Sequence, residues 1–425
     1  MPMGISLRSS AFSRVTAIAA RRTVHAGFAW MHNNPQTIMN WQKELVEIPA
    51  PPFGEQARSE RFASKLEALG VPTVRIDAIG NVIGILPASK LPTESSGPLV
   101  VLSAHLDTVF PAEAPLAPTV ERVEGALRLT APGACDNGAG LAGLLAVAQA
   151  LLQAKVELPA PLLLLANVGE EGEGDLRGVR HFYEKSPYAG RVAAHIVLDG
   201  AGSDSAVSQA LGSRRFQITV SGPGGHSFTD AGTPNPIAAL AGALAVLADT
   251  PLPEEPRTTL NVGTVHGGTS VNSIPESATA SIDFRSTHPD ELLRLEVALH
   301  RAVEDAVERA NLLAKKHVGR NRGKLNYSID KIGDRPAALV PADSPMLEAL
   351  RAVDRHLGLR TDLRLGSTDA NIPIARGIPA VSMGAGGDGG GAHTLAEWYI
   401  DKDRELGLRR VLLLTLAIAD WAADQ

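Results

Sequence analysis

The sequence predicts an α/β protein in which helices flank a central, mostly parallel sheet, with a smaller domain inserted into the larger one. Three observations support this fold class. Short apolar runs bounded by turn residues, typical of buried strands, recur through the first half of the chain. They alternate with helical patterns, which favours parallel pairing. Between residues 213 and 330 the expected order becomes β-α-β-β-α-β, which is the order of a ferredoxin-like unit.

The larger domain is expected to span residues 37–212 and 331–425. Its helical patterns cover about 37–69, with a proline-rich break at 49–54, and about 138–154. Its strands are expected at residues 74–76, 81–86, 98–103 and 194–198, and in the apolar run that begins at Leu162.

The inserted domain is expected to span residues 213–330. Its first strand alternates apolar and polar residues, as a half-buried strand does. Strands are expected at 216–221, 259–265, 278–284 and 325–329, and helices at 236–248 and 289–316.

Composition excludes several classes of protein. A net charge of −6 and a pI near 6.1 give no basis for nucleic-acid binding. Cys135 is the only cysteine, so an internal disulfide is impossible. No stretch approaches the roughly 18 uncharged apolar residues of a membrane span. We therefore expect a cytoplasmic protein that binds neither nucleic acid nor membrane.

Residues 1–36 form a basic N-terminal extension. Arg8, Arg14, Arg21 and Arg22 all precede the first acidic residue, Glu44. The apolar stretch within it is too short for a secretory signal. We expect a disordered tail; a targeting segment, or a start assigned too early, are the alternatives.

Chemically useful side chains follow the expected strands. In open α/β sheets ligands bind outside the carboxyl ends of the strands. Each residue alone has an ordinary explanation, such as a loop histidine, a helix cap or an acidic turn. Together, imidazole and carboxylate groups suit zinc, cobalt or manganese. The ordered set therefore predicts a metal site, built from His105, Asp107, Asp136, Glu170, Glu171 and Asp199.

Asp107 has a separate expected role. A carboxylate two residues after a ligating histidine can fix the tautomer and orientation of that imidazole. Asp107 is therefore predicted to hold His105. The glycine-rich run before His393 is not followed by Gly-Lys-Ser/Thr, so it is not a P-loop.

Five short motifs, taken in order, resemble those of the dinuclear zinc metallopeptidase family that includes tripeptidase (peptidase T), glutamate carboxypeptidase, the aminoacylases and succinyl-diaminopimelate desuccinylase. The resemblance runs from about Trp41 to the C-terminus. It implies a zinc-peptidase-like catalytic domain, an inserted lid or dimerisation domain, and two divalent ions, zinc before cobalt or manganese. The motifs are His105-Leu106-Asp107, Gly133-Ala134-Cys135-Asp136-Asn137, Gly169-Glu170-Glu171-Gly172, Asp199-Gly200 and Ala392-His393-Thr394.

The resemblance also implies roles. Asp136 would bridge two ions, with His105 and Asp199 completing one site. Glu171 and His393 would complete the other. Glu170 would be the general base that takes a proton from the attacking water; spacing alone does not choose it over Glu171. Many relatives have a second aspartate where this chain has Asn137, a position that is usually not a ligand.

In the inserted domain, His226 would stabilise the oxyanion, reaching an active site across a homodimer interface. Its alternative is a turn histidine. Asn272 and Arg285 resemble substrate-binding residues, and a guanidinium can grip a peptide carboxylate. For Arg285 the alternative is a salt bridge at a strand end. Ser367 lies in a segment expected to line the substrate pocket.

Asp199 guides the expected substrate. In the family, aspartate at this position is typical of aminopeptidases and tripeptidases, whereas glutamate is typical of carboxypeptidases and deacylases. We expect an aminopeptidase that cleaves di- or tripeptides. An N-acyl-amino-acid amidohydrolase or a carboxypeptidase is the alternative on the same fold. A non-catalytic relative would have lost metal ligands, and all five positions are present here.

Overall fold

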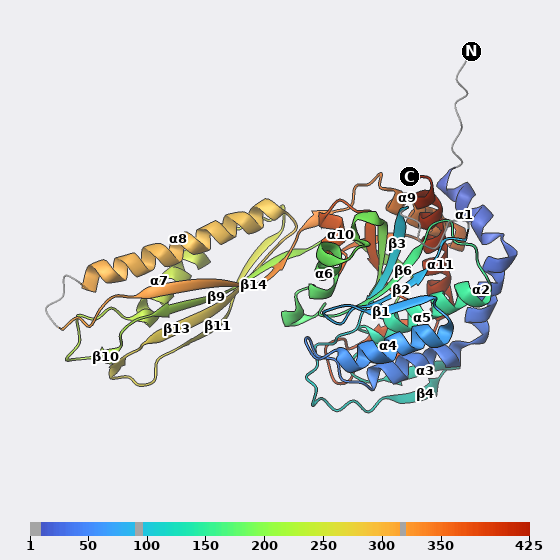
Figure 1. Cartoon of the computed structure of the whole chain (residues 1–425). Coiled ribbons are helices and arrows are strands. Elements are labelled where there is room, and N and C mark those ends of the chain that lie inside the picture. Colours follow the sequence, from blue (N-terminus) through green and yellow to red (C-terminus); the bar gives the residue numbers. More distant parts are fainter. Residues whose placement is uncertain (1–9, 90–96, 315–319) are drawn as a thin grey trace, which may run out of the picture. The chain divides into compact units, whose positions relative to one another are not determined.

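The computed structural model describes residues 10–89, 97–314 and 320–425 (Figure 1). Within them the chain folds into two compact units. Leu211–Ala338 forms the smaller unit, and the chain before and after it forms the larger one.

The larger unit contains a mixed sheet in the order β1-β2-β6-β3-β7-β17-β8-β15, with β16 paired to β8. Strands β6, β3, β7 and β17 run parallel to one another. β2 is antiparallel to β6, and β1 to β2. The strands are β1 Thr73–Ile76, β2 Val82–Leu86, β3 Leu99–His105, β6 Leu162–Asn167, β7 Val192–Leu198, β8 Ser205–Ala210, β15 Ala338–Leu339, β16 Asp362–Gly366 and β17 Ala380–Met383.

Helices cover both faces of this sheet. One face packs on α6 and α10: Val101, Leu163 and Leu165 belong to one buried cluster with Phe182 of α6 and Ile372 of α10. α5 and α11 contact β3 and β7 and are buried almost all round, as apolar helices inside a domain are. The helices are α3 Pro35–Val46, α4 Gln56–Leu69, α5 Gly138–Gln153, α6 Arg177–Lys185, α9 Pro345–Leu357, α10 Asn371–Ala375 and α11 Arg404–Ala423.

None of the helices in the described residues combines the length and the apolar character that crossing a membrane requires.

A second sheet in the larger unit was not expected from the sequence. Its order is β18-β19-β5-β4, all antiparallel. It pairs Trp398 with Thr130 and so joins two segments far apart in the chain. β5 leads into the loop that carries Asp136, and the β18–β19 connection carries His393. The strands are β4 Thr119–Val123, β5 Ala126–Thr130, β18 Asp388–Gly390 and β19 Trp398–Ile400.

The expectation of a disordered N-terminal extension is wrong for the described part of it. Residues Ala11–Ala19 form α1 and Arg22–Asn33 form α2. Both helices are amphipathic and bury Val15, Ile18 and Phe28 among their apolar residues. α1 contacts α9 and α11, and α2 contacts α5 and α11. Residues 1–9 lie outside the described part of the chain.

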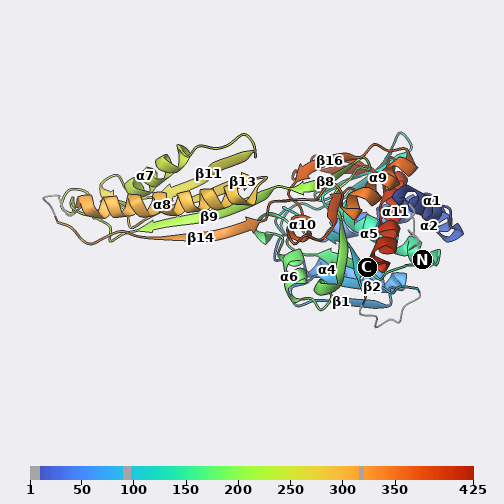
Figure 2. The same ribbon diagram turned by 90° about the horizontal axis from the view of Figure 1, so that it is seen from above.

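The smaller unit has the strand and helix order β9-α7-β11-β13-α8-β14 (Figure 2). A short β10–β12 ladder forms a separate two-stranded sheet. Its sheet order is β11-β13-β9-β14, antiparallel throughout, with α7 and α8 packed on it. The elements are β9 Gly212–Ser221, β10 Gly225–His226, α7 Pro236–Ala248, β11 Thr258–Gly267, β12 Ser273–Ile274, β13 Ser277–Ser286, α8 Pro289–Ala314 and β14 Asn326–Arg335.

The smaller unit extends beyond the expected boundary at residue 330. β14 pairs with β9 along almost its whole length, from Asn326 opposite Ser221 to Arg335 opposite Ser213. Dividing the chain at 330 would cut this ladder, so the unit ends at Ala338.

One buried ion pair offers a stability test. Arg410 of α11 donates to both carboxylate oxygens of Asp354 in α9, at 2.6 and 2.8 Å, and both side chains are buried. Asp354→Ala leaves a buried guanidinium without its partner and should lower the free energy of unfolding by roughly 3–5 kcal/mol. Asp362→Ala, which breaks an exposed pair with Arg364, should cost less than about 1 kcal/mol. Urea unfolding of the two variants measures both; equal stabilities would contradict this assignment.

Candidate metal centre

Three parallel strands deliver one half of the site. β3 lies between β6 and β7 and pairs in parallel with both, so their carboxyl ends meet at one edge of the sheet. His105 is the last residue of β3, and Asp199 directly follows β7. The Glu170-Glu171 dyad follows β6 after a short turn. The hydrogen-bond register of the sheet therefore fixes these residues relative to one another.

Two loops deliver the other half. Asp136 lies between β5 and α5, and His393 lies between β18 and β19. Asn137, rather than Asp136, caps α5: its Oδ1 accepts from the amides of Gly140 and Gly200, at 3.1 and 3.0 Å. Its Nδ2 donates to the carbonyl of Leu198 at 2.8 Å. An aspartate would place an acceptor against that carbonyl, so an amide suits this position.

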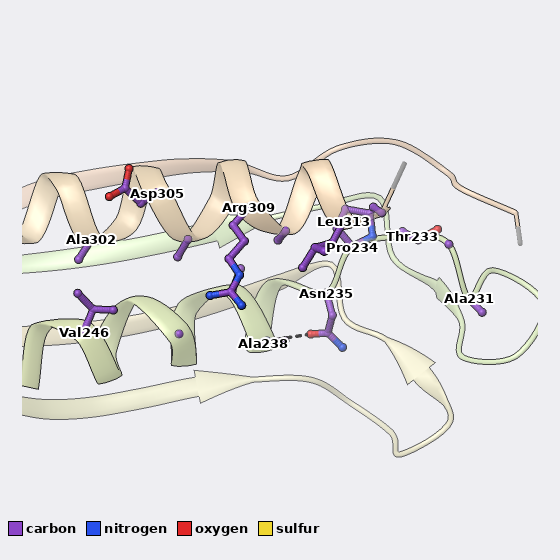
Figure 3. A pocket seen from close by; sticks show the side chains of 16 residues that line it. Ala231, Thr233, Pro234, Asn235, Ala238, Val246, Ala302, Asp305, Arg309 and Leu313 are labelled. Atoms are coloured by element: carbon purple, nitrogen blue, oxygen red, sulfur yellow. Dashed lines mark hydrogen bonds between the residues drawn. The ribbon is translucent and has the colours of Figure 1, made fainter. Parts of the chain in front are cut away.

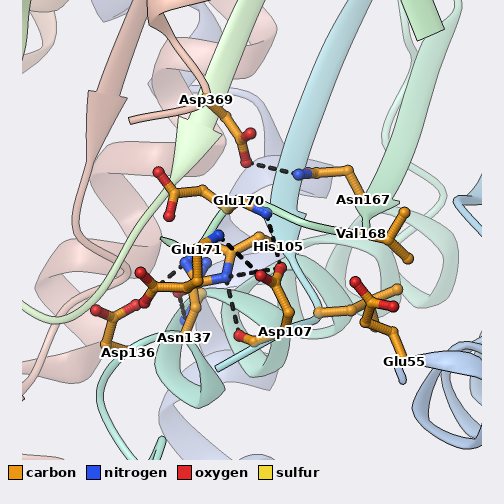
Figure 4. A network of polar contacts seen from close by, with 12 residues as sticks. Glu55, His105, Asp107, Asp136, Asn137, Asn167, Val168, Glu170, Glu171 and Asp369 are labelled. Atoms are coloured by element: carbon orange, nitrogen blue, oxygen red, sulfur yellow. Dashed lines mark hydrogen bonds and ion pairs between the residues drawn. The ribbon is translucent and has the colours of Figure 1, made fainter. Parts of the chain in front are cut away.

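The side chains converge around Asp136 (Figure 4). Oδ1 of Asp136 lies 3.1 Å from Nε2 of His105, and Oδ2 lies 3.2 Å from Nε2 of His393. The same nitrogen of His393 lies 3.2 Å from Oε1 of Glu171. Nε2 of His105 also lies 3.9 Å from Oδ1 of Asp199. The structure thus brings together all five residues predicted as metal ligands.

These distances fit ligands that share cations. Ligand atoms at ~2.1 Å from a tetrahedral zinc ion lie about 3.4 Å from one another. The four contacts above range from 3.1 to 3.9 Å. Ligand atoms of His105, Asp136 and Glu171 all lie within 4.8 Å of one another. The set contains only imidazole and carboxylate groups, which are the usual donors to zinc, cobalt and manganese.

The pKa values of the clustered side chains also fit a cation site. Burial, followed by the neighbouring charge of Asp136, raises the pKa of Glu171 to about 7. Burial also acts to raise the pKa of Asp136, but hydrogen bonds with His105 and His393 outweigh it and hold that pKa well below its usual value. The hydrogen bond with Asp136 is the largest cause that raises the pKa of His393 to about 9. The cluster is therefore short of positive charge.

Asp107 contacts both His105 and the acidic dyad. Nδ1 of His105 lies 3.1 Å from the backbone carbonyl oxygen of Asp107 but 3.6 Å from its carboxylate. The carbonyl therefore fixes the tautomer and leaves Nε2 of His105 facing Asp136. The Asp107 carboxylate accepts instead from the amides of Glu170 and Glu171, at 2.9 and 2.8 Å. Asp107 thus holds the backbone of the acidic dyad as well as the histidine.

The two glutamates of the dyad occupy different environments. Glu171 has extended backbone angles, φ −82° and ψ 147°, so the preceding side chain, that of Glu170, points in another direction. Its carboxylate contacts His393. The Glu170 carboxylate is also buried, and in the view of Figure 4 it lies above the group formed by His105, Asp136 and Glu171.

Two buried carboxyl groups near the centre were not singled out from the sequence. Asp369 lies two residues after Ser367, and burial, the largest cause, raises its pKa to about 7. It accepts a hydrogen bond from Nδ2 of Asn167, at the end of β6, at 2.6 Å. Glu397 accepts three amides of the Asp136 loop. For Glu397 the sequence carries no signal, because its partners lie more than 260 residues away.

In the smaller unit, the structure brings His226 and Asn272 together. His226 pairs with Ser273 in the β10–β12 ladder, and the amide of Ser227 donates to the carbonyl of Asn272 at 3.0 Å. The His226 side chain is exposed, and its Nδ1 accepts from the amides of Phe228 and Thr229, at 3.2 and 3.4 Å.

Arg285 is placed apart from that pair. It lies near the far end of β13 from Ser277, about 27 Å along a strand that rises ~3.4 Å per residue. Its Nε donates to Oδ2 of Asp283 at 2.8 Å, while Arg215 binds the other oxygen. The salt bridge, which was the alternative to substrate binding, is what the structure shows for Arg285.

The comparisons with known proteins agree with this arrangement. The sequence profile of peptidase family M20/M25/M40 matches residues 101–417. Among curated proteins, the chain is similar to a probable carboxypeptidase of Aspergillus clavatus, at 31% identity over 273 residues. That match covers 59% of this chain and 58% of the relative, so the chain spans little more than half the length of this relative.

Two solved structures share the fold. The aminopeptidase PepT of Bacillus cereus is 20% identical, with a TM-score of 0.68, covering 92% of this chain and 99% of that one. A tripeptidase of Staphylococcus aureus is 23% identical with the same TM-score and coverage. These likenesses confirm the predicted fold class: an α/β unit with a mixed central sheet and a separate small antiparallel unit.

If the five side chains hold cations, zinc should stabilise the folded protein. A ligand present at 100 times its dissociation constant adds about 2.7 kcal/mol. The unfolding temperature of metal-stripped protein should therefore rise by several degrees on adding zinc, as measured by calorimetry. His105→Ala should abolish most of this rise, and His226→Ala, in the other unit, should leave it intact. An equal rise in the His105→Ala variant would contradict the assignment.

Proposed function

The chain belongs to peptidase family M20/M25/M40, and from that premise we propose that it is a metal-dependent peptidase with two divalent ions, most favourably zinc. One observation carries the proposal: the two oxygens of a single carboxylate, Asp136, face two different histidines, His105 and His393. A carboxylate in this position is suited to bridge two cations. Asp199 then completes one set of ligands and Glu171 the other.

Each remaining side chain has a defined task. When bound, the two cations polarise a carbonyl group and lower the pKa of water. Glu170 is the general base: it accepts the proton of the attacking water and returns it to the leaving amine. Asp107 orients this glutamate by holding the amides of the dyad. Ser367, which precedes the buried Asp369, contributes to the substrate pocket.

His226 is proposed to stabilise the oxyanion. Because its Nδ1 accepts backbone hydrogen bonds, the ring proton of the neutral imidazole must lie on Nε2. Nε2 is then a donor on an exposed side chain, as a group that binds a developing oxyanion must be. Asn272, beside it in the β10–β12 region, is proposed to bind substrate.

We propose an aminopeptidase that acts on di- or tripeptides. Asp199 supports this choice, because aminopeptidases and tripeptidases of the family tend to have aspartate at this position. The similarity in fold to an aminopeptidase and a tripeptidase is compatible with it. The second candidate is a carboxypeptidase or deacylase; sequence similarity to two probable carboxypeptidases of Aspergillus supports the first of these.

Hydrolysis assays distinguish these candidates. Zinc- or cobalt-loaded protein should cleave tripeptides with a free amino group, including those amidated at the C-terminus, and should leave N-acetylated substrates intact. Glu170→Gln should lower kcat by roughly 10²–10⁴-fold while metal content stays near that of the wild type. Cleavage of N-acetylated but not free-amino substrates would overturn the aminopeptidase assignment. Loss of metal in Glu170→Gln would show that Glu170 is a ligand.

We further propose that the smaller unit forms a homodimer. α7 carries no charged residue, and Ile237 and Val246 are exposed on its outer face. A groove of about 460 Å³ opens between α7 and α8 and is lined by Val246 and many small apolar residues, with Asp305 and Arg309 of α8 also in its lining (Figure 3). α7 also contacts β11, an edge strand of the described sheet. A second copy, related by a two-fold axis, would cover this helix face and pair with this edge.

A charge on this helix face tests the dimer. Val246→Glu should convert a species of twice the 44.5 kDa chain mass into monomer in light scattering coupled to size exclusion. Leu293→Glu, at a similarly exposed apolar residue of α8, is the matched control and should remain dimeric. A monomeric wild type, or a Val246→Glu variant that stays dimeric, would contradict the proposal.

A further inference from the structure

Glu397 is a buried carboxylate that binds the loop carrying Asp136. Its side chain is 0% exposed. Oε1 accepts from the backbone amides of Cys135 and Asp136, each at 2.7 Å, and Oε2 accepts from the amide of Gly133 at 3.0 Å. Both oxygens are therefore committed to one loop. A buried carboxylate is costly unless it is hydrogen-bonded in this way, so its presence here needs a reason.

The segment that carries Glu397 also carries His393, four residues earlier. Two turn hydrogen bonds fold the residues between them: Thr394 N donates to Gly391 O at 3.0 Å, and Glu397 N donates to Thr394 O at 3.1 Å. His393 then meets Asp136 at 3.2 Å. Glu397 and His393 thus contact the same loop, one through its backbone and the other through its side chain.

The two halves of the metal centre differ in how they are held. His105 and Asp199 adjoin strands whose register fixes them. Asp136 and His393 lie in irregular loops, for which no such register exists. The β5–β19 pairing brings the loops near each other, and the side chain of Glu397, directly before β19, binds the backbone of the Asp136 loop.

We infer that Glu397 is a positioning residue that sets the separation of Asp136 and His393, and thereby the affinity of the cation position they share with Glu171. This inference rests on the proposed two-cation site. Glu397 is not itself a ligand, since both its oxygens face backbone amides. Partners that orient metal ligands typically contribute 10–100-fold to metal affinity.

The chemistry of the contact predicts which substitution matters. In Glu397→Gln, the amide oxygen can still accept from Cys135 and Asp136, but the NH2 group would face the donor amide of Gly133. Two donors repel, so the loop must shift. Glu397→Asp keeps the charge but is one methylene shorter, so it should retain part of the effect.

Cobalt titration followed by visible absorption and by metal analysis tests this inference without measuring hydrolysis. Wild-type protein should bind two equivalents. Glu397→Gln should bind one with near wild-type affinity and the second roughly 10–100-fold more weakly, with Glu397→Asp in between. Asp401→Asn is the matched control: Asp401 accepts an amide of β5 in the same sheet, away from the metal loop, and should bind both equivalents normally.

A double-mutant cycle shows whether Glu397 acts through the loop ligands. In the His393→Ala background, which removes a ligand of the second position, Glu397→Gln should add little further loss. Wild-type affinity for both equivalents in Glu397→Gln, or fully additive losses, would overturn the inference. If Glu397→Gln does not fold, Glu397→Asp decides: normal binding overturns the inference and weakened second-ion binding supports it. A wild type that binds fewer than two equivalents would overturn the proposed two-cation site as well.

Discussion

The crowding of carboxylates at the ends of three parallel strands is the constraint on which the site depends. Parallel pairing of β3 with β6 and β7 places His105, the acidic dyad and Asp199 at one edge of the sheet. Asp136 joins them from a loop. Such groups repel one another in a buried setting unless positive charge balances them. As metal ligands the two histidines are neutral, so bound divalent cations would supply that positive charge.

This constraint explains the hydrogen-bonding around the centre. Asp107, Asn137 and Glu397 bind backbone amides rather than facing one another. Each therefore fixes a segment that carries a ligand while its own polar atoms are satisfied. The same arrangement separates the roles of Glu170 and Glu171, because only one of two adjacent side chains can face His393.

Much of the fold can be predicted from local sequence patterns. Buried parallel strands are continuous apolar runs, as at Leu162–Asn167, and they end where the ligands begin. α7 was predicted at the residues where it occurs, because proline starts it and an apolar run continues to Ala248. The family followed from the ordered motifs, and the profile match confirms it.

Other features depended on contacts that local patterns do not encode. The small β18–β19–β5–β4 sheet pairs strands that lie far apart in the chain, and β18 and β19, with three residues each, are too short to show a periodicity. α1 and α2 are amphipathic helices that bury their apolar faces by packing on α9, α5 and α11. The basic charge of that segment favours a disordered tail, whereas its amphipathic spacing favours the helices that the structure shows. Arg285 faces Asp283 on its own strand, an arrangement that residue type alone cannot distinguish from ligand binding.

Anomalous diffraction from crystals of the zinc-loaded protein would test the central claim most directly. We expect two zinc peaks about 3.5–4 Å apart, one on each side of the Asp136 carboxylate. One peak should lie beside His105 and Asp199, and the other beside Glu171 and His393. A single peak, or a peak ligated by Glu170 in place of Glu171, would contradict the account.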